Sequence, residues 1–317
     1  MEYRQLGSSG LRVSTVSLGS WLTYGNTVDQ ETTDRIVGTA VDRGVNLLDT
    51  ADVYNRGGGE RALAKAIAGR RREHLVIASK CFFPMSEDVN DRGLSRKHVM
   101  ESAHQSLSRL GTDYLDLFQC HRPDPETPVE ETAMAMDDLI RQGKVLYWGV
   151  SMWSADLIER TMEFCRAQAL HLPVSNQPNY NLLEREIEVL VIPTCAALGV
   201  SQIVFSPLAQ GVLTGKYPPA TEPPRGSRAA DHRINQFIGR YLTDECLERV
   251  VALTGLAGES GLSPTVLALA WCLRQENVSS VLVGATSVAQ LEHNLQAAEV
   301  SLAPDTLERV EELFPST

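Results

Sequence analysis

Four polar side chains in this 317-residue chain could together transfer a proton: Asp49, Tyr54, Lys80 and His121. A free phenol has a pKa of about 10, which is too high for easy proton exchange at neutral pH. A nearby ammonium stabilises the phenolate and lowers the phenol pKa, and a carboxylate beside the ammonium keeps it charged and fixed. An imidazole can hydrogen-bond the reacting oxygen and orient it. If the four side chains meet, they predict an acid–base site centred on the tyrosine.

Each of these residues has an ordinary structural alternative when it is considered alone. Asp49 could cap a loop, Tyr54 could pack in the core, Lys80 could be a solvated charge and His121 could fill a structural role. Their shared placement favours the site, because Asp49, Lys80 and His121 stand at or just after the ends of three successive apolar segments. Tyr54 follows Asp49 by five residues.

The elements that must position these side chains alternate along the chain. Short segments of β-type sequence predict β-strands at Thr15–Leu18, Asn46–Asp49, Leu75–Ser79, Leu115–Cys120, Val145–Val150, Val174–Gln177, Ser201–Phe205 and Ser280–Val283. Amphipathic segments predict helices at Asp29–Arg43, Glu60–Gly69, Ser95–Leu110, Val129–Gln142, Ser154–Arg166, Glu184–Leu198, Thr243–Glu259, Ser263–Arg274, Val288–Ala297 and Asp305–Leu313. This alternation predicts an α/β fold, a parallel (β/α)8 TIM barrel that spans residues 1–317 as one domain. The active site of such a barrel lies at the C-terminal ends of the strands.

Residues that begin and end helices stand at the borders of these segments. Side chains that cap helix N-termini are expected at Asp29, Ser95, Ser154 and Ser263, the last followed by Pro264. Glycines that suit a left-handed helix end follow four helical segments, at Gly44, Gly111, Gly143 and Gly199.

One segment, Ser206–Arg240, interrupts the alternation with a run rich in Gly, Pro and polar residues. A connection of this length inside a compact domain is usually functional or mobile. It carries five basic residues, Lys216, Arg225, Arg228, Arg233 and Arg240. It is either a phosphate-binding cover over a cofactor or a solvated excursion, and its sequence alone leaves both open.

Composition and charge exclude several classes of protein. The chain is 43% hydrophobic and 22% charged, which is typical of a globular enzyme. A net charge of −11 disfavours binding to nucleic acid or to an anionic membrane surface. The six cysteines form no CxxC pair, which indicates reduced thiols. No apolar run approaches 18 residues, so we expect no membrane insertion and a cytoplasmic location.

Other motifs fit less well. Gly57–Ala62 matches G-x-G-x-x-A, but Lys80 ends the following strand where a dinucleotide site needs an acidic residue, so a loop before a helix is favoured. The segment GVLTGKY resembles a phosphate-binding P-loop, yet Gln210 replaces its first glycine and Tyr217 its Ser or Thr. Cys120 and His121 are neighbours in a strand and point to opposite faces, so we expect no metal site.

Stretches along nearly the whole chain resemble the aldo-keto reductases, in the branch of the voltage-gated potassium-channel β subunits and their bacterial relatives. They are YRQLGSSGLRVS, LGSW, LLDTADVY, RGLSRKH, RPDPETPVEET, YWGVSMWS, SPLAQGVLTGKY, AWCLR and SSVLVGATSVAQLEHN. The resemblance implies a (β/α)8 barrel with an N-terminal hairpin near Tyr3–Gln5 and Leu11–Val13 and an additional C-terminal helix. It also implies NADPH-dependent reduction of a carbonyl compound.

The resemblance assigns roles to the four polar residues. Tyr54 would donate the proton, Lys80 and Asp49 would tune its pKa, and His121 would orient the carbonyl group. The channel β subunits typically carry Asn at the position of His121, so this site resembles that of a working reductase. The alternative is an NADPH-binding regulatory or redox-sensing subunit of an ion channel with little turnover.

For the cofactor, NADPH or NADP+, the resemblance implies contacts from several segments. Ser151 and Gln177 match residues that hold the nicotinamide carboxamide, Phe205 matches an aromatic ring that stacks on it, and Arg228 matches an arginine that clamps phosphate. The further matched positions are Ser20, Trp21, Ser206, Pro207, Leu208, Gly211, Lys216, Gly284, Thr286, Gln290 and Asn294.

This chain departs from the family pattern at three places. Met152 stands where Arg or Asn is usual, His293 stands where an acidic residue near the adenine is usual, and the stretch from Pro218 to Arg233 is individual to this chain in length and composition.

Aromatic residues predict an apolar substrate pocket, for aldehydes or bulky ketones, lined by Trp21, Tyr24, Phe82, Phe83 and Trp153. By analogy with the channel branch we expect a homo-oligomer, a tetramer or octamer.

Overall fold

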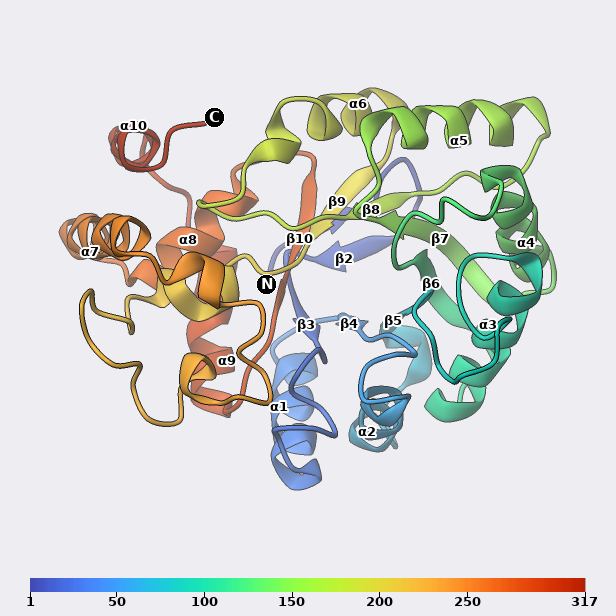
Figure 1. Ribbon diagram of the computed structural model, residues 1–317, viewed down its shortest axis with the longest axis horizontal. Coiled ribbons are helices and arrows are strands. Elements are labelled where there is room, and N and C mark those ends of the chain that lie inside the picture. The colour runs from blue at the N-terminus through green and yellow to red at the C-terminus, as the bar shows by residue number, and fades with distance from the viewer. Residues whose placement is uncertain (317) are drawn as a thin grey trace.

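The structure, a computed structural model, describes residues 1–316 and is built around a closed barrel of parallel strands (Figure 1). The barrel strands are β3 (Val16–Gly19), β4 (Leu47–Asp49), β5 (Val76–Cys81), β6 (Leu115–Cys120), β7 (Val145–Ser151), β8 (Ser175–Gln177), β9 (Ser201–Val204) and β10 (Val278–Val283). β10 pairs with both β3 and β9, which closes the ring. The predicted (β/α)8 barrel is confirmed, and each predicted strand overlaps one of these eight.

Helices surround the barrel. They are α1 (Gln30–Asp42), α2 (Gly58–Ala66), α3 (Arg96–Leu110), α4 (Val129–Arg141), α5 (Ala155–Ala167), α6 (Val191–Leu198), α7 (Asp244–Glu259), α8 (Pro264–Leu273), α9 (Val288–Leu295) and α10 (Pro304–Leu313). α10 is the additional C-terminal helix that the resemblance implied, and it packs against α7 at one side of the molecule (Figure 1).

The predicted residues at the helix ends act as expected. The side chains of Asp29, Ser95, Ser154 and Ser263 each accept a hydrogen bond from the backbone of the helix that follows. The four expected glycines have positive φ angles, between +65° and +89°: Gly44, Gly111, Gly143 and Gly199. Local sequence therefore marks the start of four of the ten described helices and the end of four.

The helix predicted over Glu184–Leu198 is shorter than expected, since α6 begins only at Val191. The preceding residues are drawn into contacts with the end of the chain. Arg185 forms ion pairs with Glu188 and Glu311, at 2.7 and 2.6 Å. The contact with Glu311 joins residues 126 positions apart, so the local sequence carries no pattern that predicts it.

Within residues 1–316, no single helix is long and apolar enough to cross a membrane. α7 and α8 together reach the length and hydropathy of a span, but they meet at 90° and α8 is buried in the protein from Thr265 to Leu273.

An antiparallel hairpin, β1 (Tyr3–Gln5) and β2 (Arg12–Ser14), precedes the barrel as the resemblance implied. Leu6 and Val13 of this region are fully buried and share an apolar core with Leu47 and Val76, the first residues of β4 and β5. Apolar side chains thus fill the amino end of the barrel interior. Polar side chains further along the same strands, Asp49 and Lys80, lie toward the carboxyl end of the barrel.

The hairpin turn lies directly against the barrel at Gly7. This residue has φ +56°, and a methyl group there would collide with the carbonyl oxygen of Val174 and lie 2.6 Å from that of Gly199. Its amide donates to Ser201 Oγ at 2.7 Å, so the backbone cannot move away without losing a hydrogen bond. Only glycine fits this contact.

We expect Gly7→Ala to destabilise the protein by about 2–4 kcal/mol, because it combines left-handed strain with a backbone collision. Gly69→Ala is the matched control, since Gly69 also has a positive φ, +79°, but has no atom within 4 Å of an added methyl group. That control should cost about 1 kcal/mol. Urea unfolding of both variants measures the difference, and equal losses would contradict the proposed collision.

Candidate active site

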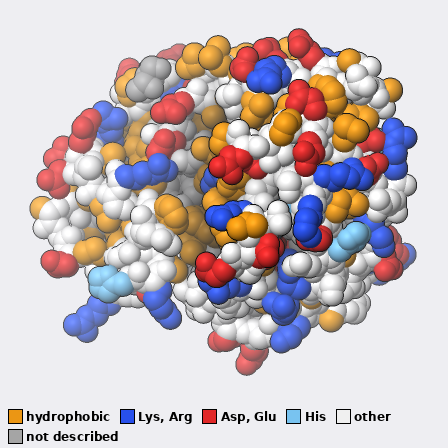
Figure 2. All heavy atoms as spheres, turned by 45° about the vertical axis from the view of Figure 1, so that its right-hand side comes forward, with side chains coloured by type: hydrophobic (Ala, Val, Ile, Leu, Met, Phe, Trp, Pro, Cys, Tyr) orange, Lys and Arg blue, Asp and Glu red, His pale blue; other side chains and the backbone are white. Residues whose placement is uncertain are grey.

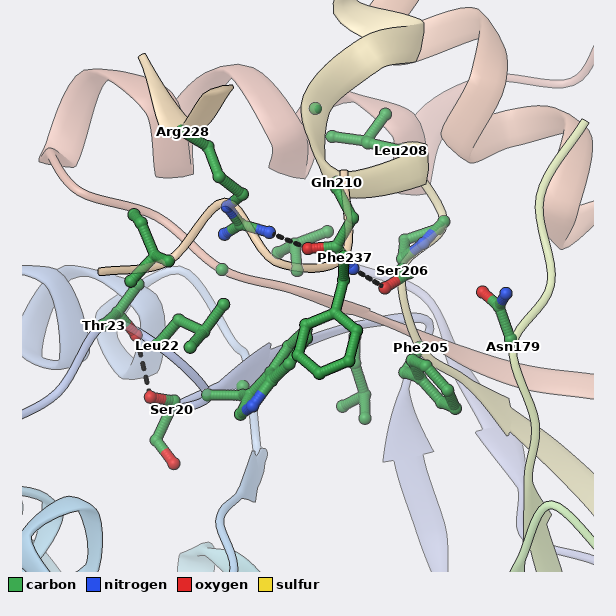
Figure 3. Close-up of a pocket in the computed structure, with 18 of the residues that line it drawn as sticks. Ser20, Leu22, Thr23, Asn179, Phe205, Ser206, Leu208, Gln210, Arg228 and Phe237 are labelled. Atoms are coloured by element: carbon green, nitrogen blue, oxygen red, sulfur yellow. Dashed lines mark hydrogen bonds between the residues drawn. The ribbon is translucent and has the colours of Figure 1, made fainter. Parts of the chain in front are cut away.

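A cavity of about 1470 Å³ opens at the carboxyl end of the barrel strands. Its wall combines the ends of these strands with residues of the segment Ser206–Arg240. Figure 2 shows a hollow in the surface that is bordered by hydrophobic and charged side chains. Figure 3 shows part of the wall in detail, with residues from both sources facing the same space.

The four residues predicted to move a proton form one chain of contacts at the floor of the cavity. Lys80 Nζ donates to Asp49 Oδ1 at 2.5 Å and to the carbonyl oxygen of Thr50 at 2.8 Å. The same Nζ lies 3.4 Å from the hydroxyl of Tyr54, which lies 3.5 Å from His121 Nε2. The ammonium of Lys80 and the imidazole of His121 therefore both lie next to the Tyr54 hydroxyl.

Two glutamines complete the surroundings of Asp49. Its second oxygen, Oδ2, accepts from Gln177 Nε2 at 2.9 Å and from Gln119 Nε2 at 3.3 Å. Sequence reasoning assigned Gln177 to the cofactor and missed Gln119. The available signal was its place two residues before His121, which puts both on the same face of β6.

The segment that carries Tyr54 is held from behind by buried carboxylates. Asp52 Oδ2 accepts from Ser102 Oγ at 2.7 Å, and Glu60 forms an ion pair with Arg109. Ser102 and Arg109 belong to α3, so this helix fixes the loop between β4 and α2. Burial raises the pKa of Asp52 to about 7.

The glycine-rich stretch Gly57–Ala62 forms the start of α2. Gly57 precedes this helix with φ +78°, and a methyl group on Gly59 would lie 3.3 Å from Tyr54 Cβ. The stretch therefore turns the chain close behind Tyr54. The expectation of a loop before a helix holds only for Gly57 and is wrong for Gly58–Ala62, which form the first turns of α2.

The pKa directions define the protonation states at the tyrosine. Burial raises the pKa of Tyr54, although the charge of Lys80 opposes that effect. The expectation of a lowered phenol pKa is therefore wrong for the protein alone, because withdrawal from water outweighs the ammonium. Burial and the nearby charges of Lys80 and Arg122 hold the pKa of His121 well below its usual value. The site thus pairs a protonated phenol with a neutral imidazole.

At the other end of the cavity, two basic side chains have no acidic partner. Lys216 lies next to Gly211, where a methyl group would be 3.2 Å from Nζ. Arg228 donates to Gln210, whose Nε2 donates to Ser206 Oγ at 2.5 Å (Figure 3). Among residues 1–316, no carboxylate lies within 4 Å of Lys216 or Arg228. Cations without a counterion in a cavity fit an anionic group such as a phosphate.

The remaining residues assigned by resemblance to the cofactor also line the cavity. They are Ser20, Trp21, Ser151, Phe205, Pro207, Leu208, Gly284, Thr286, Gln290 and Asn294. Ser151 Oγ donates to the carbonyl oxygen of Gln177 at 2.7 Å, and both the amide and the hydroxyl of Thr286 donate to Gln290 Oε1 at 2.9 Å. The departures Met152 and His293 lie in the same wall.

Two of the residues predicted to line the substrate pocket lie elsewhere, whereas Trp21, Tyr24 and Phe83 do line the cavity. Phe82 and Trp153 pack against the apolar core between the barrel and its helices. β5 ends at Cys81, so strand alternation no longer directs Phe82. Trp153 follows Met152, whose φ of +58° turns the chain and places the indole in the core, where it is 3% exposed.

Arg122 and Phe237 are among the cavity residues that sequence reasoning missed. The ring of Phe237 lies 5.4 Å from that of Trp21, so the segment Ser206–Arg240 reaches across the cavity (Figure 3). The available signal was the apolar pattern Ile234, Phe237 and Ile238 within a segment rich in Gly, Pro and polar residues. The structure favours the covering arrangement of this segment over the solvated one.

Comparisons with known proteins agree with this geometry. A family model described as the aldo/keto reductase family matches residues 15–314. A probable voltage-gated potassium channel subunit beta from Arabidopsis thaliana is 41% identical over all of this chain and 97% of its own length. One from Oryza sativa subsp. japonica is 40% identical with the same coverage, and a putative one from Schizosaccharomyces pombe is 40% identical over 99% of this chain and 94% of its own. Since the family match runs from β3 to α10, this chain belongs to the aldo/keto reductase family.

Proposed function

We propose that this protein uses NADPH to reduce aldehyde or ketone carbonyls to alcohols, with Tyr54 as the proton donor. The observation that carries the proposal is the tyrosine hydroxyl at the cavity floor, 3.4 Å from Lys80 Nζ and 3.5 Å from His121 Nε2. Membership of the family supports oxidoreduction with a nicotinamide cofactor in general.

The cavity residues fit such a cofactor. The unpaired cations Lys216 and Arg228 suit its phosphates, and the polar groups of Ser151 and Gln177 suit its carboxamide. Thr286, Gln290 and Asn294 would hold the adenosine end, and the ring of Phe205 would face the nicotinamide. When bound, the cofactor supplies a hydride to the carbonyl carbon.

The side chains of this protein then deliver the proton. Tyr54 enters the reaction as a phenol and transfers its proton to the carbonyl oxygen. Lys80 stabilises the phenolate that forms, and Asp49 keeps the ammonium charged and in place. His121 is neutral, so it can donate a hydrogen bond to the carbonyl oxygen without supplying a competing acid.

A second function is favoured by the names of the relatives, which are described as potassium channel β subunits. In that case the protein would bind NADPH tightly, turn over slowly and respond to its oxidation within a channel complex or a homo-oligomer. Negligible turnover on a broad panel of carbonyl compounds, with stable cofactor retention, would favour this function.

Tyr54→Phe should lower kcat by about 10²–10⁴-fold while the Kd for NADPH stays near that of the wild type, because only the proton donor is lost. NADPH oxidation, followed by absorbance with aromatic and aliphatic aldehydes and ketones, measures kcat. Tyr24→Phe is the matched control, since Tyr24 is a second buried tyrosine beside the same cavity whose hydroxyl has no hydrogen-bond partner among the described residues. Retained turnover in Tyr54→Phe would exclude it as the donor.

The pH dependence of reduction should follow from the same protonation states. The raised pKa of Tyr54 keeps the phenol protonated, and the lowered pKa of His121 keeps the imidazole neutral, from about pH 6.5 to 9. We expect kcat/KM to be flat across this window and to fall at higher pH as the phenol loses its proton. Initial rates at constant ionic strength test this, and a wild-type titration near pH 7 that vanishes in His121→Asn would refute it.

Arg228→Ala should weaken binding of NADPH more than binding of NADH, by about 10-fold or more, if the guanidinium contacts the 2′-phosphate. Fluorescence titration gives both dissociation constants. The control is Arg233→Ala, which removes a cavity cation already paired with Asp231 at 2.7 Å. Equal losses for both cofactors would assign Arg228 to the shared pyrophosphate instead.

A further inference from the structure

We propose that Arg122 makes this site selective for anionic carbonyl compounds, in which a carboxylate or phosphate accompanies the aldehyde or ketone. The inference rests on the proposed function, because it names the substrate class of the same site. It comes from a basic side chain that neither the proton-transfer site nor the cofactor accounts for.

Arg122 lies beside the reacting groups. It follows His121 at the end of β6 and lines the cavity. Its Nη1 donates to the carbonyl oxygen of His121 at 2.5 Å and lies 3.4 Å from Ser151 Oγ. Its guanidinium carbon is 5.5 Å from the ring centre of Phe83, which is 4.9 Å from the imidazole ring of His121. An anion held by Arg122 would therefore sit next to the tyrosine and histidine.

Among residues 1–316, Arg122 forms no ion pair. Five basic side chains line the cavity: Arg122, Lys216, Arg228, Arg233 and Arg240. Arg233 and Arg240 each lie within 4 Å of an acidic side chain. Lys216 and Arg228 lie at the end assigned to the cofactor phosphates. Arg122 is left as an unpaired cation at the end where the substrate reacts.

The donors of Arg122 are also largely unused. Both of its contacts are neutral and both involve Nη1, so Nε and Nη2 have no hydrogen-bond partner in the described part of the chain. Its side chain is half-buried, and burial lowers its pKa. A guanidinium presents paired N–H groups that match the two oxygens of a carboxylate or phosphate. An anionic substrate would supply both the missing charge and the missing acceptors.

The chemistry of reduction is unchanged by this recognition. The carbonyl carbon still gains the hydride and the carbonyl oxygen the proton, while the anionic group keeps its bonds. The binding free energy of that group would position the carbonyl against Tyr54 and His121.

The test compares matched substrates. 4-Carboxybenzaldehyde and its neutral methyl ester differ in charge at one position, and glyceraldehyde 3-phosphate against glyceraldehyde gives the corresponding phosphate pair. We expect kcat/KM to favour the anionic member of at least one pair by about 10- to 100-fold, the scale of a charge-assisted hydrogen bond. The pair that shows the preference identifies carboxylate or phosphate as the recognised group.

Variants assign the preference to the residue. Arg122→Gln should abolish it, Arg122→Lys should restore part of it, and Arg240→Gln should retain it because Arg240 is paired with Glu184 at 3.3 Å. Equal kcat/KM within both wild-type pairs would overturn the inference. So would an equal loss on charged and neutral substrates in Arg122→Gln, combined with weaker NADPH binding, since Arg122 would then serve the cofactor.

A binding measurement separates this inference from the proposed function. Calorimetric titration of the NADP+-saturated protein with benzoate, and separately with inorganic phosphate, should show binding of at least one anion that Arg122→Gln loses. This result would support anion recognition even if no carbonyl compound is turned over. Turnover of neutral aldehydes without binding of either anion would leave the reductase proposal standing and refute the role of Arg122.

Discussion

The buried ion pair of Lys80 and Asp49 constrains the rest of this structure. Lys80 is fully buried and Asp49 is 4% exposed, and leaving either charge unpaired in such a site costs about 3–5 kcal/mol. Their remaining donors and acceptors are satisfied by the backbone of Thr50 and by the side chains of Gln119 and Gln177. The pair and its two glutamines come from four different strands, β4, β5, β6 and β8. The geometry around Tyr54 therefore forms only when these four strands are in place in the barrel.

The other charged groups near the barrel also gather at the carboxyl end of its strands. The barrel interior is apolar at its amino end, around Leu6 and Leu47, so polar groups accumulate at the carboxyl end. The chain carries a net charge of −11, yet three cations in the cavity, Lys216, Arg228 and Arg122, form no ion pair with the residues that the structure describes. Local positive charge inside an acidic protein concentrates anionic ligands at the cavity. The first two cations belong to the segment Ser206–Arg240 and the third lies beside His121, so the proposed cofactor and the proposed anionic substrate would use different cations.

Local sequence predicts the barrel well because its signals are local. Most strands, such as β5 and β10, are short runs rich in apolar residues, and capping residues such as Ser95 and Ser263 mark where helices begin. It also predicts which polar residues meet below the cavity, because Asp49, Lys80 and His121 lie at or next to the carboxyl ends of their strands. Prediction from local sequence fails where tertiary contacts determine the position or the pKa of a side chain. Trp153 is turned into the core by the left-handed backbone of Met152, and the phenol pKa of Tyr54 depends on burial that no spacing reveals.

The segment Ser206–Arg240 shows how strain and side-chain bonding combine near the cofactor end. Ser206, Ala209 and Gln210 have φ angles of +52°, +45° and +60°, and each left-handed residue that is not glycine costs about 1–3 kcal/mol. Gln210 departs from the P-loop pattern, but its side chain links Ser206 to Arg228 across this strained turn. The link holds the guanidinium at the cavity wall before any anion binds. An arginine positioned in advance loses less rotamer freedom on binding. The strained backbone is therefore tied to the placement of a cation, which accounts for a glutamine where glycine would be less strained.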